Sequence, residues 1–446
     1  MTRWRAPLVL FVVSLAAYAA VASTRLLHAS ADPHFAVQAD AWLHGRMDIE
    51  RWPTGADDPA KVEEVRLDDG TLVRGRRLKA RPTFRILGGR EVPTARIAQS
   101  VRTLHYVSFP PFPSVLMLPQ AAISGARAND VATTVVLAAL VPAAFLLYLR
   151  RLRAAGLTAR TPSDEMWLSV LLGFGTVFFF TAVQGRVWFT AHVVGVLLAI
   201  GYAWASVDAE RPILAGVCLA LATATRTPML FLAPLFLYEV WRAGGARGAV
   251  VRRLALFAAP LVVIGALLAL YNVARFGELA EFGHSYLEVR QQAQIERFGL
   301  FSSAYLGRNL TVALTLLPQF SSTAPFVSIS GHGLALWVTT PAFLYLLWPA
   351  RKGEWHRMLW LTVALVAAWS LFYQNSGWVQ FGYRFSLDYV VLLVTLLAVG
   401  GRRLGRFAKI VIVAGIVVNL FGAITFSRVG GIYRQDNAAY DCVVAH

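Results

Sequence analysis

The sequence predicts an all-α polytopic membrane protein with about 11 transmembrane helices, interfacial helices and a small β-hairpin in the first outside loop. Hydrophobic residues make up 57% of the 446 residues and charged residues 15%, with a mean hydropathy of +0.54. Soluble domains are about 25% charged. Long apolar runs recur along the chain, and arginine and lysine gather in alternate loops between them. This composition excludes an ordinary soluble enzyme, a disordered protein and a fibrous repeat.

The apolar runs give the expected membrane spans. A helix that crosses a hydrocarbon core of roughly 30 Å needs about 20 apolar residues. The first run could be a signal peptide, but no cleavage site of small residues leads from it into a soluble domain, so we interpret it as a retained helix. The expected spans are 7–25, 130–149, 166–184, 187–206, 212–225, 228–241, 254–274, 333–349, 357–374, 386–400 and 408–426.

The positive charges set the expected orientation. The spans 212–225 and 228–241 share a break at Arg226-Thr227-Pro228 and could be one broken helix, which would invert everything after them. If 212–225 and 228–241 are two separate spans and the N-terminus is inside, four Arg- or Lys-rich loops lie inside, as the positive-inside rule requires. A single span would place the last two of these outside. We therefore expect two spans, and a C-terminus outside. The four basic loops are 150–160, 242–253, 351–357 and 402–409.

The net charge is +17, from 42 Lys and Arg against 25 Asp and Glu. The inside loops explain much of this excess, so no nucleic-acid partner is needed; membrane lipids are the expected contact. The two cysteines, Cys218 and Cys442, indicate no disulfide framework. The chain has no P-loop, GxSxG, HExxH or CxxC motif. These absences argue against an ATPase on this chain, but a carrier driven by an ion gradient stays possible.

Residues 1–446 are expected to form one transmembrane domain with two long outside loops, 26–129 and 275–331. In the first loop, Asp68-Asp69-Gly70 is typical of a hairpin turn, and 33–44 predicts an interfacial helix. The Pro-broken apolar stretch 105–119 predicts another. The second loop has acidic residues at helical spacing that could bind a divalent cation or form a hydrated face: Glu278, Glu281, His284 and Glu288.

Several loose motifs, in order, support a family resemblance. The first outside loop opens with Asp32-Pro33-His34-Phe35, followed by Leu43-His44-Gly45-Arg46-Met47-Asp48. It continues with Tyr106-Val-Ser-Phe-Pro-Pro-Phe-Pro-Ser-Val-Leu-Met-Leu-Pro119. Further segments are Tyr271-Asn272-Val-Ala-Arg275-Phe276-Gly277 and Gln380-Phe-Gly-Tyr-Arg384-Phe-Ser-Leu-Asp388. Together they resemble the GT-C superfamily of integral-membrane glycosyltransferases, and in particular bacterial mannosyltransferase-like members that use polyprenyl-phosphate sugars.

The resemblance implies an inverting glycosyltransferase in a bacterial inner membrane, with the active site facing the periplasm or exterior. Its donor would be a polyprenyl-phosphate sugar, and its acceptor, which the motifs leave unnamed, a cell-envelope lipid, glycan or protein. Asp32 is the expected catalytic base, although its alternative role is to cap the helix after Pro33. Known members often carry an acidic pair where this chain has Asp32-Pro33, so no metal site is assigned, but a divalent cation stays possible. Asp40, eight residues later, could be a second carboxylate or part of a solvated face.

Three arginines are expected to bind the donor phosphate, because a guanidinium group can pair with two phosphate oxygens. Arg226 interrupts an apolar region at an outside end, Arg275 ends the seventh span, and Arg384 begins the tenth. Asp388 is spaced i,i+4 from Arg384, so it could form a structural ion pair with it or orient it on phosphate. Arg186 is a weaker candidate. His34 and Tyr106 are expected to support the site.

Two other functional classes fit an apolar polytopic chain. A secondary transporter or lipid flippase would be expected to show internal repeats and charges near the bilayer midplane. The odd span count and the two large outside loops favour an enzyme acting at the membrane surface. A non-catalytic assembly or sensing protein would retain its function in Asp32→Asn, whereas the enzyme would not.

Overall fold

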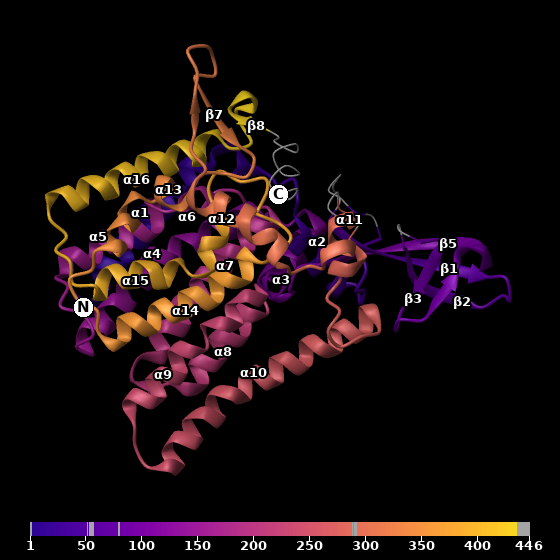
Figure 1. Ribbon diagram of the computed structural model, residues 1–446, viewed down its shortest axis with the longest axis horizontal. Helices are drawn as coiled ribbons and strands as arrows, with labels where there is room; N and C mark the ends of the chain where they lie inside the picture. The colour runs from indigo at the N-terminus through magenta and orange to yellow at the C-terminus, as the bar shows by residue number, and fades with distance from the viewer. Residues whose placement is uncertain are drawn as a thin grey trace.

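The computed structural model describes residues 2–50, 52, 58–78, 81–287, 289 and 292–434. Within these ranges the protein is mostly helical, with a small sheet at one end of a helical bundle (Figure 1). The longest helices are α1 (Thr2–Ala22), α4 (Asp130–Ala154), α7 (Val187–Ser206), α10 (Arg247–Phe276), α14 (Glu354–Leu371) and α16 (Arg406–Thr425). The shorter ones are α2 (His34–Leu43), α3 (Phe112–Ser124), α5 (Pro162–Phe174), α6 (Phe178–Ala182), α8 (Pro212–Thr223), α9 (Pro234–Ala243), α11 (Gln292–Phe298), α12 (Leu306–Leu314), α13 (Leu336–Thr339) and α15 (Val390–Val399).

Five helical segments among the described residues are long and apolar enough to cross a membrane, whereas about 11 spans were expected. The first, Trp4–Leu27, includes most of α1, and the other four contain α4, α7, α10 and α16. Several other expected spans are broken into shorter pieces. The span 166–184 divides into α5 and α6, 333–349 into α13 and the 3₁₀ helix η8 (Pro341–Leu347), and 386–400 into part of the 3₁₀ helix η9 (Arg384–Asp388) and α15.

The chain reverses direction at the break near Arg226, as the two-span interpretation of 212–241 predicts. Helix α8 ends at Thr223, the 3₁₀ helix η5 covers Thr227–Leu232, and α9 follows. Asp208, just before α8, contacts Arg242 at the end of α9, with 2.6 Å between Oδ1 and Nη2. The start of α8 and the end of α9 therefore lie together at one end of the bundle, and Arg226 lies at the turn between the two helices.

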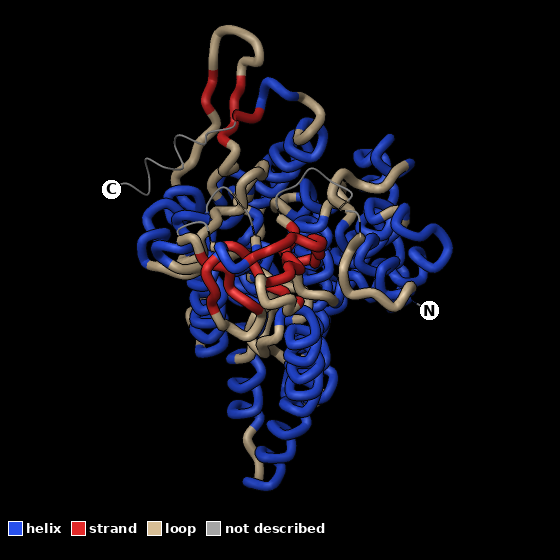
Figure 2. The backbone as a smooth tube through the Cα atoms, turned by 90° about the vertical axis from the view of Figure 1, so that its right-hand side faces the viewer, coloured by secondary structure: helices blue, strands red, loops and turns tan. Residues whose placement is uncertain are grey.

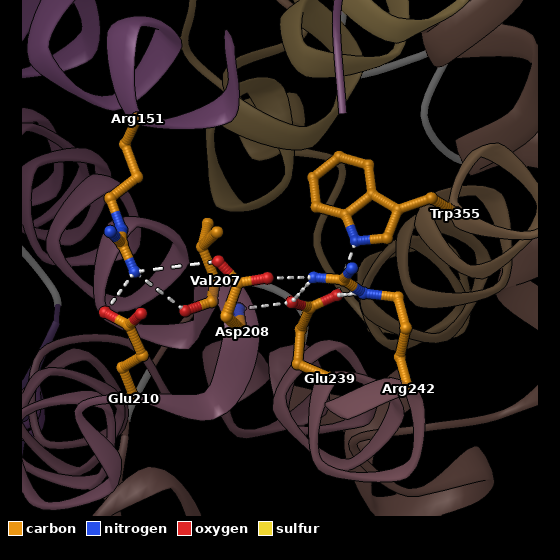
Figure 3. A network of polar contacts seen from close by, with 7 residues as sticks. All are labelled: Arg151, Val207, Asp208, Glu210, Glu239, Arg242 and Trp355. Carbon is orange, nitrogen blue, oxygen red and sulfur yellow. Dashed lines mark hydrogen bonds and ion pairs between the residues drawn. The ribbon is translucent and has the colours of Figure 1, made fainter. Parts of the chain in front are cut away.

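The end of the bundle that contains this contact carries a polar network centred on the buried side chain of Glu239 (Figure 3). The carboxylate of Glu239 accepts hydrogen bonds from the Arg242 guanidinium, the Asp208 backbone N–H and the Trp355 indole N–H. Arg151 from α4 bonds to Glu210 and the Val207 carbonyl oxygen. The network joins α4, α9, α14 and the turn between α7 and α8 at the end predicted to face inward.

The apolar surface is divided between a packed core and an exposed belt. Helices α4, α5, α7, α8 and α15 supply most of the buried core. Helix α10 is the opposite case: only 6% of its most apolar 18-residue window is buried. It runs along the lower edge of the view in Figure 1, toward the sheet. An apolar helix of 30 residues that exposes most of its side chains is suited to contact with lipid.

The first outside loop contains more strand than the expected hairpin. Its strands are β1 (Pro59–Leu67), β2 (Leu72–Arg77), β3 (Thr83–Ile86), β4 (Glu91–Pro93) and β5 (Ile97–Val107), in the order β4-β3-β2-β1-β5. The expected turn at Asp68-Asp69-Gly70 does join β1 to β2, in antiparallel register. This sheet, which we name the β-lobe, projects beyond the helix ends in Figure 1 and lies in front of the bundle in Figure 2.

The expected interfacial helices are present as α2 and α3. The expected helical face in the second outside loop is not. Residues 277–283 contain no helix, and a 3₁₀ turn covers only His284–Tyr286. Glu281 instead accepts a hydrogen bond from the Gly283 backbone N–H at 2.6 Å. Glu288 lies outside the described residues. The loop ends in a hairpin of β6 (Gln319–Phe320) and β7 (Val327–Ser330), which pairs with β8 (Tyr433–Arg434).

Candidate active site

A cavity of about 780 Å³ opens at the end of the bundle that carries the β-lobe. Its wall comes from segments far apart in sequence, including the start of α7, the break before η5, the loop after α14 and η9. A volume of this size suits a substrate rather than a single water or ion. The charged residues of its wall are Asp32, Asp58, Arg186, Arg226, Arg384 and Arg434.

Asp32 lies in this wall, just before α2. Helix α2 begins at His34 with Pro33 at its N-cap and no side-chain capping bond, so Asp32 does not have the alternative capping role. The Asp32 carboxylate is 3.4 Å from the Arg186 guanidinium, and its backbone oxygen accepts a hydrogen bond from Val187 N–H at the start of α7. Burial raises the pKa of the Asp32 carboxyl, while the positive charge of Arg186 opposes that rise.

A second carboxylate, Asp58, lies in the same wall immediately before β1. Its Oδ1 is 3.0 Å from Nε2 of His34, whose side chain is fully buried. The negative charge of Asp58 also raises the pKa of Asp32, because a nearby anion disfavours ionisation. Sequence reasoning identified Asp32 and His34 but missed Asp58. The adjacent acids Asp57-Asp58 in the sequence were the available signal.

Arg226 and Asp388 form a two-point ion pair at the cavity wall. The Arg226 Nε bonds to Oδ1 of Asp388, and its Nη2 donates to Oδ2 at 2.8 Å. His192 from α7 lies on the other side of Asp388, with 3.4 Å between Nδ1 and Oδ1. Among the described residues, Asp388 therefore pairs with Arg226 and not with Arg384, so the ion-pair alternative for Arg384 and Asp388 is wrong.

Of Arg226 and Arg384, Arg384 has the more available guanidinium. Its Nη1 donates to the Val379 carbonyl oxygen at 3.0 Å, whereas its buried Nε has no hydrogen-bond partner among the described residues. The guanidinium lies over the rings of Phe189 and Phe385, which hold its plane. A buried, oriented N–H group without a protein partner is suited to an anionic ligand.

The remaining predicted residues lie away from the cavity wall. The Asp40 carboxylate is 3.4 Å from the exposed side chain of His44. Arg275 is buried and uses its guanidinium to bond the Val107 carbonyl oxygen and the Asn272 side chain, which ties α10 to β5. Tyr106 is buried in the apolar contact between the β-lobe and α10.

The rest of the wall is largely apolar and aromatic. Beyond the charged groups, the cavity is bordered by residues of the second outside loop and by α14, notably Leu287, Phe301 and Trp369. The Phe301 and Trp369 ring centroids are 4.3 Å apart. Within the described ranges, no group of three or more His, Cys, Asp or Glu residues has an arrangement that could hold a metal ion. The cavity thus combines a charged part with an apolar part.

Comparison with known proteins gives one distant similarity. No family model and no curated protein matches the chain. Among solved structures, it is similar to the crystal structure of the Archaeoglobus fulgidus oligosaccharyltransferase in the apo form, with 11% sequence identity and a TM-score of 0.46. The match covers 100% of this chain and 60% of that chain. A similarity at this level says nothing about substrate or reaction, so the function proposed below rests on the cavity.

Proposed function

We propose that this protein is an inverting glycosyltransferase that moves a sugar from a polyprenyl-phosphate donor to a cell-envelope acceptor. The observation that carries the proposal is the placement of Asp32, Arg226 and Arg384 in one cavity at the β-lobe end of the bundle. The motif resemblance to GT-C glycosyltransferases points to the same chemistry. The five apolar segments and the apolar part of the cavity suit a donor that carries a lipid tail.

In this reaction Asp32 is the base. The acceptor oxygen forms a bond to the anomeric carbon, and its proton passes to the Asp32 carboxylate. The bond between the anomeric carbon and the phosphate oxygen breaks, and the phosphate leaves with the electron pair. Arg384 stabilises the charge on this phosphate. Arg226 lies at the same wall, where the Asp388 carboxylate fixes its guanidinium and balances its charge, so Arg384 is the main source of positive charge for the phosphate. A single displacement inverts the anomeric carbon and needs one carboxylate as base.

A deletion strain can supply both substrates for the test. In a strain that lacks this protein, mass spectrometry of lipids and envelope glycans should show an accumulated lipid-linked sugar and one missing decoration. The lipid extract of that strain then serves as donor and its cell envelope as acceptor for the purified protein in liposomes. We call this the reconstituted assay.

The Asp32→Asn protein should insert and fold normally but lose at least about 100-fold of the transfer rate, because general-base catalysis contributes about 10²–10⁴-fold. Thermal unfolding in detergent checks the fold. Undiminished transfer by Asp32→Asn would remove Asp32 as the base. A deletion strain with neither an accumulated lipid-linked sugar nor a missing decoration would overturn the glycosyltransferase proposal.

The alternative is a secondary transporter or lipid flippase. Counterflow of a radiolabelled solute in liposomes, without cleavage of any lipid-linked donor, would favour it over the enzyme. The cavity lies at one end of the bundle, next to the outside loops. A transporter binds its substrate near the bilayer midplane, so this placement favours the enzyme.

A further inference from the structure

The pair formed by His34 and Asp58 is not used by the reaction proposed above. His34 is the first residue of α2, and Asp58 immediately precedes β1. Their side chains meet at 3.0 Å, between Nε2 and Oδ1, beside the cavity. An ionised carboxylate can only accept hydrogen bonds, so opposite an ionised Asp58 the His34 Nε2–H is the donor and Oδ1 the acceptor.

The surroundings of His34 fix the direction of this hydrogen bond. The imidazole lies among the rings of Trp52, Phe109 and Trp188, with centroids 4.6, 6.1 and 6.1 Å away. The side chain of His34 is fully buried, so its ring cannot rotate freely. Asp58 is also held through its backbone, because its carbonyl oxygen accepts a hydrogen bond from Ser108 Oγ at 3.2 Å.

The second oxygen of the Asp58 carboxylate does not take part in the bond to His34. Its Oδ2 is buried and has no hydrogen-bond partner among the described residues. A buried acceptor without a donor is unfavourable, and the usual remedy is a water or a ligand hydroxyl. Asp32 differs, because its carboxylate already faces the Arg186 guanidinium. Within the part of the chain that the structure describes, Asp32 therefore pairs with a cation and Asp58 with an imidazole, which leaves only Asp58 with a buried oxygen that lacks a hydrogen-bond donor.

We propose that Asp58, positioned by His34, binds a second hydroxyl group of the acceptor while Asp32 takes the proton of the first. The inference rests on the glycosyltransferase proposal and narrows its acceptor class. An acceptor held through two hydroxyl groups is a saccharide or another polyol head group, since a serine or threonine side chain offers only one. His34 is a positioning residue, because it acts on the acceptor only through Asp58.

The kinetic effect of Asp58→Asn tests the inference in the reconstituted assay. The His34 N–H faces the amide oxygen of the variant, so the amide nitrogen takes the place of Oδ2 and cannot accept from a hydroxyl. We expect the half-saturating amount of acceptor to rise about 10- to 100-fold, the usual range for losing a hydrogen bond to a charged group. The half-saturating amount of donor should stay within about twofold. Asp69→Asn, in the exposed β1–β2 turn, is the matched control.

Two His34 variants separate positioning from folding. His34→Gln keeps an N–H donor near the position of Nε2 and should restore acceptor saturation to near the wild-type value. His34→Leu removes the donor and should resemble Asp58→Asn. The double variant His34→Leu/Asp58→Asn should be no worse than Asp58→Asn alone, because both changes remove one interaction.

The outcomes separate a failure of the Asp58 inference from a failure of the glycosyltransferase proposal. If the wild-type protein transfers sugar and a folded Asp58→Asn saturates with acceptor normally, Asp58 does not bind the acceptor and only this inference fails. Equal loss of donor and acceptor saturation would assign Asp58 a general structural role and would also overturn it. If the wild-type protein transfers no sugar, the glycosyltransferase proposal itself fails. Where His34→Leu does not fold, Asp58→Asn and His34→Gln still decide.

Discussion

At the residue scale, the environment of Asp32 suits it to accept a proton. Burial is the largest influence and raises its pKa above the ordinary 3.8, and Asp58 raises it further. Arg186 and His34 act in the opposite direction. A carboxylate with a raised pKa holds a proton more strongly and is therefore a better general base, provided that it is still ionised at the working pH.

The pH dependence of transfer should follow from these influences. The base works only when ionised, so the rate should fall as the pH drops through the pKa of Asp32 in the folded protein. Arg186→Gln removes a cation that lowers this pKa, so the acid side of the profile should move to higher pH. Rates measured from pH 4 to 8 in the reconstituted assay would show it. A shift to lower pH would contradict the assignment of Asp32.

Arg384 and Arg275 make a matched pair for the phosphate assignment. Arg384→Gln removes a guanidinium from the cavity wall, and we expect the half-saturating amount of donor to rise roughly 10- to 100-fold. Arg275→Gln removes bonds to Val107 and Asn272 instead. It should lower the unfolding temperature while donor saturation in the folded fraction is unchanged. The opposite pattern would transfer the phosphate role to Arg275.

The local helix type explains one error of the residue-level prediction. Arg384 and Asp388 share a face only in an α-helix, where residues four apart are neighbours. Residues 384–388 form a 3₁₀ helix with three residues per turn, which directs these two side chains differently. Sequence patterns predicted the charge type at the cavity, but not that Asp388 would bond to Arg226 from another segment. Such pairings depend on tertiary contacts that no local spacing encodes.

At the scale of elements, the sequence predicted where apolar segments lie better than how long their helices are. A span packed among other helices can be broken, because neighbouring protein groups satisfy its freed backbone groups. Asn419 of α16 does this by donating to the Thr339 carbonyl oxygen at 2.6 Å, next to the break between α13 and η8. Hydropathy alone does not locate such a partner. The reversal at Arg226 was predictable, because charge pattern and Pro228 both marked it.

Glu239, the buried centre of the network in Figure 3, should be important for stability. Glu239→Leu would leave the Trp355 indole, the Asp208 backbone N–H and Arg242 without their shared acceptor. We expect a loss of about 3 kcal/mol or more, typical of removing one partner of a buried ion pair. Glu210→Gln, which breaks an exposed ion pair with Arg151, should cost less than about 1 kcal/mol. Denaturant unfolding in detergent measures both, and equal effects would contradict the ranking.

At the scale of the whole molecule, the two ends of the bundle differ in chemistry. One end carries the cavity and the β-lobe, and the other carries the Glu239 network and several of the basic loops. The distribution of basic loops predicts that the second end faces the cytoplasm. The sequence predicted this polarity because it depends on summed composition, whereas the five-stranded β-lobe depends on pairings between distant strands, of which only the turn at Asp69-Gly70 was evident.

Labelling of single cysteines in intact spheroplasts tests the orientation. With Cys218 and Cys442 replaced by serine, a membrane-impermeant maleimide should modify Thr71→Cys in the β-lobe before lysis. Lys352→Cys, between η8 and α14, should react only after lysis. Both positions are exposed. Labelling in the reverse order would place the cavity on the cytoplasmic side.

The β-lobe leaves and rejoins the bundle at neighbouring points. Pro59 at its start pairs with Val107 at its end, and the Ser108 hydroxyl bonds to the Asp58 carbonyl oxygen beside them. A segment whose ends already meet can change length without displacing its anchors. Residues 59–107 are therefore placed where a change in length would leave the rest of the fold intact. We expect related chains to differ there in size, to diverge in acceptor choice, and to keep the same cavity beneath.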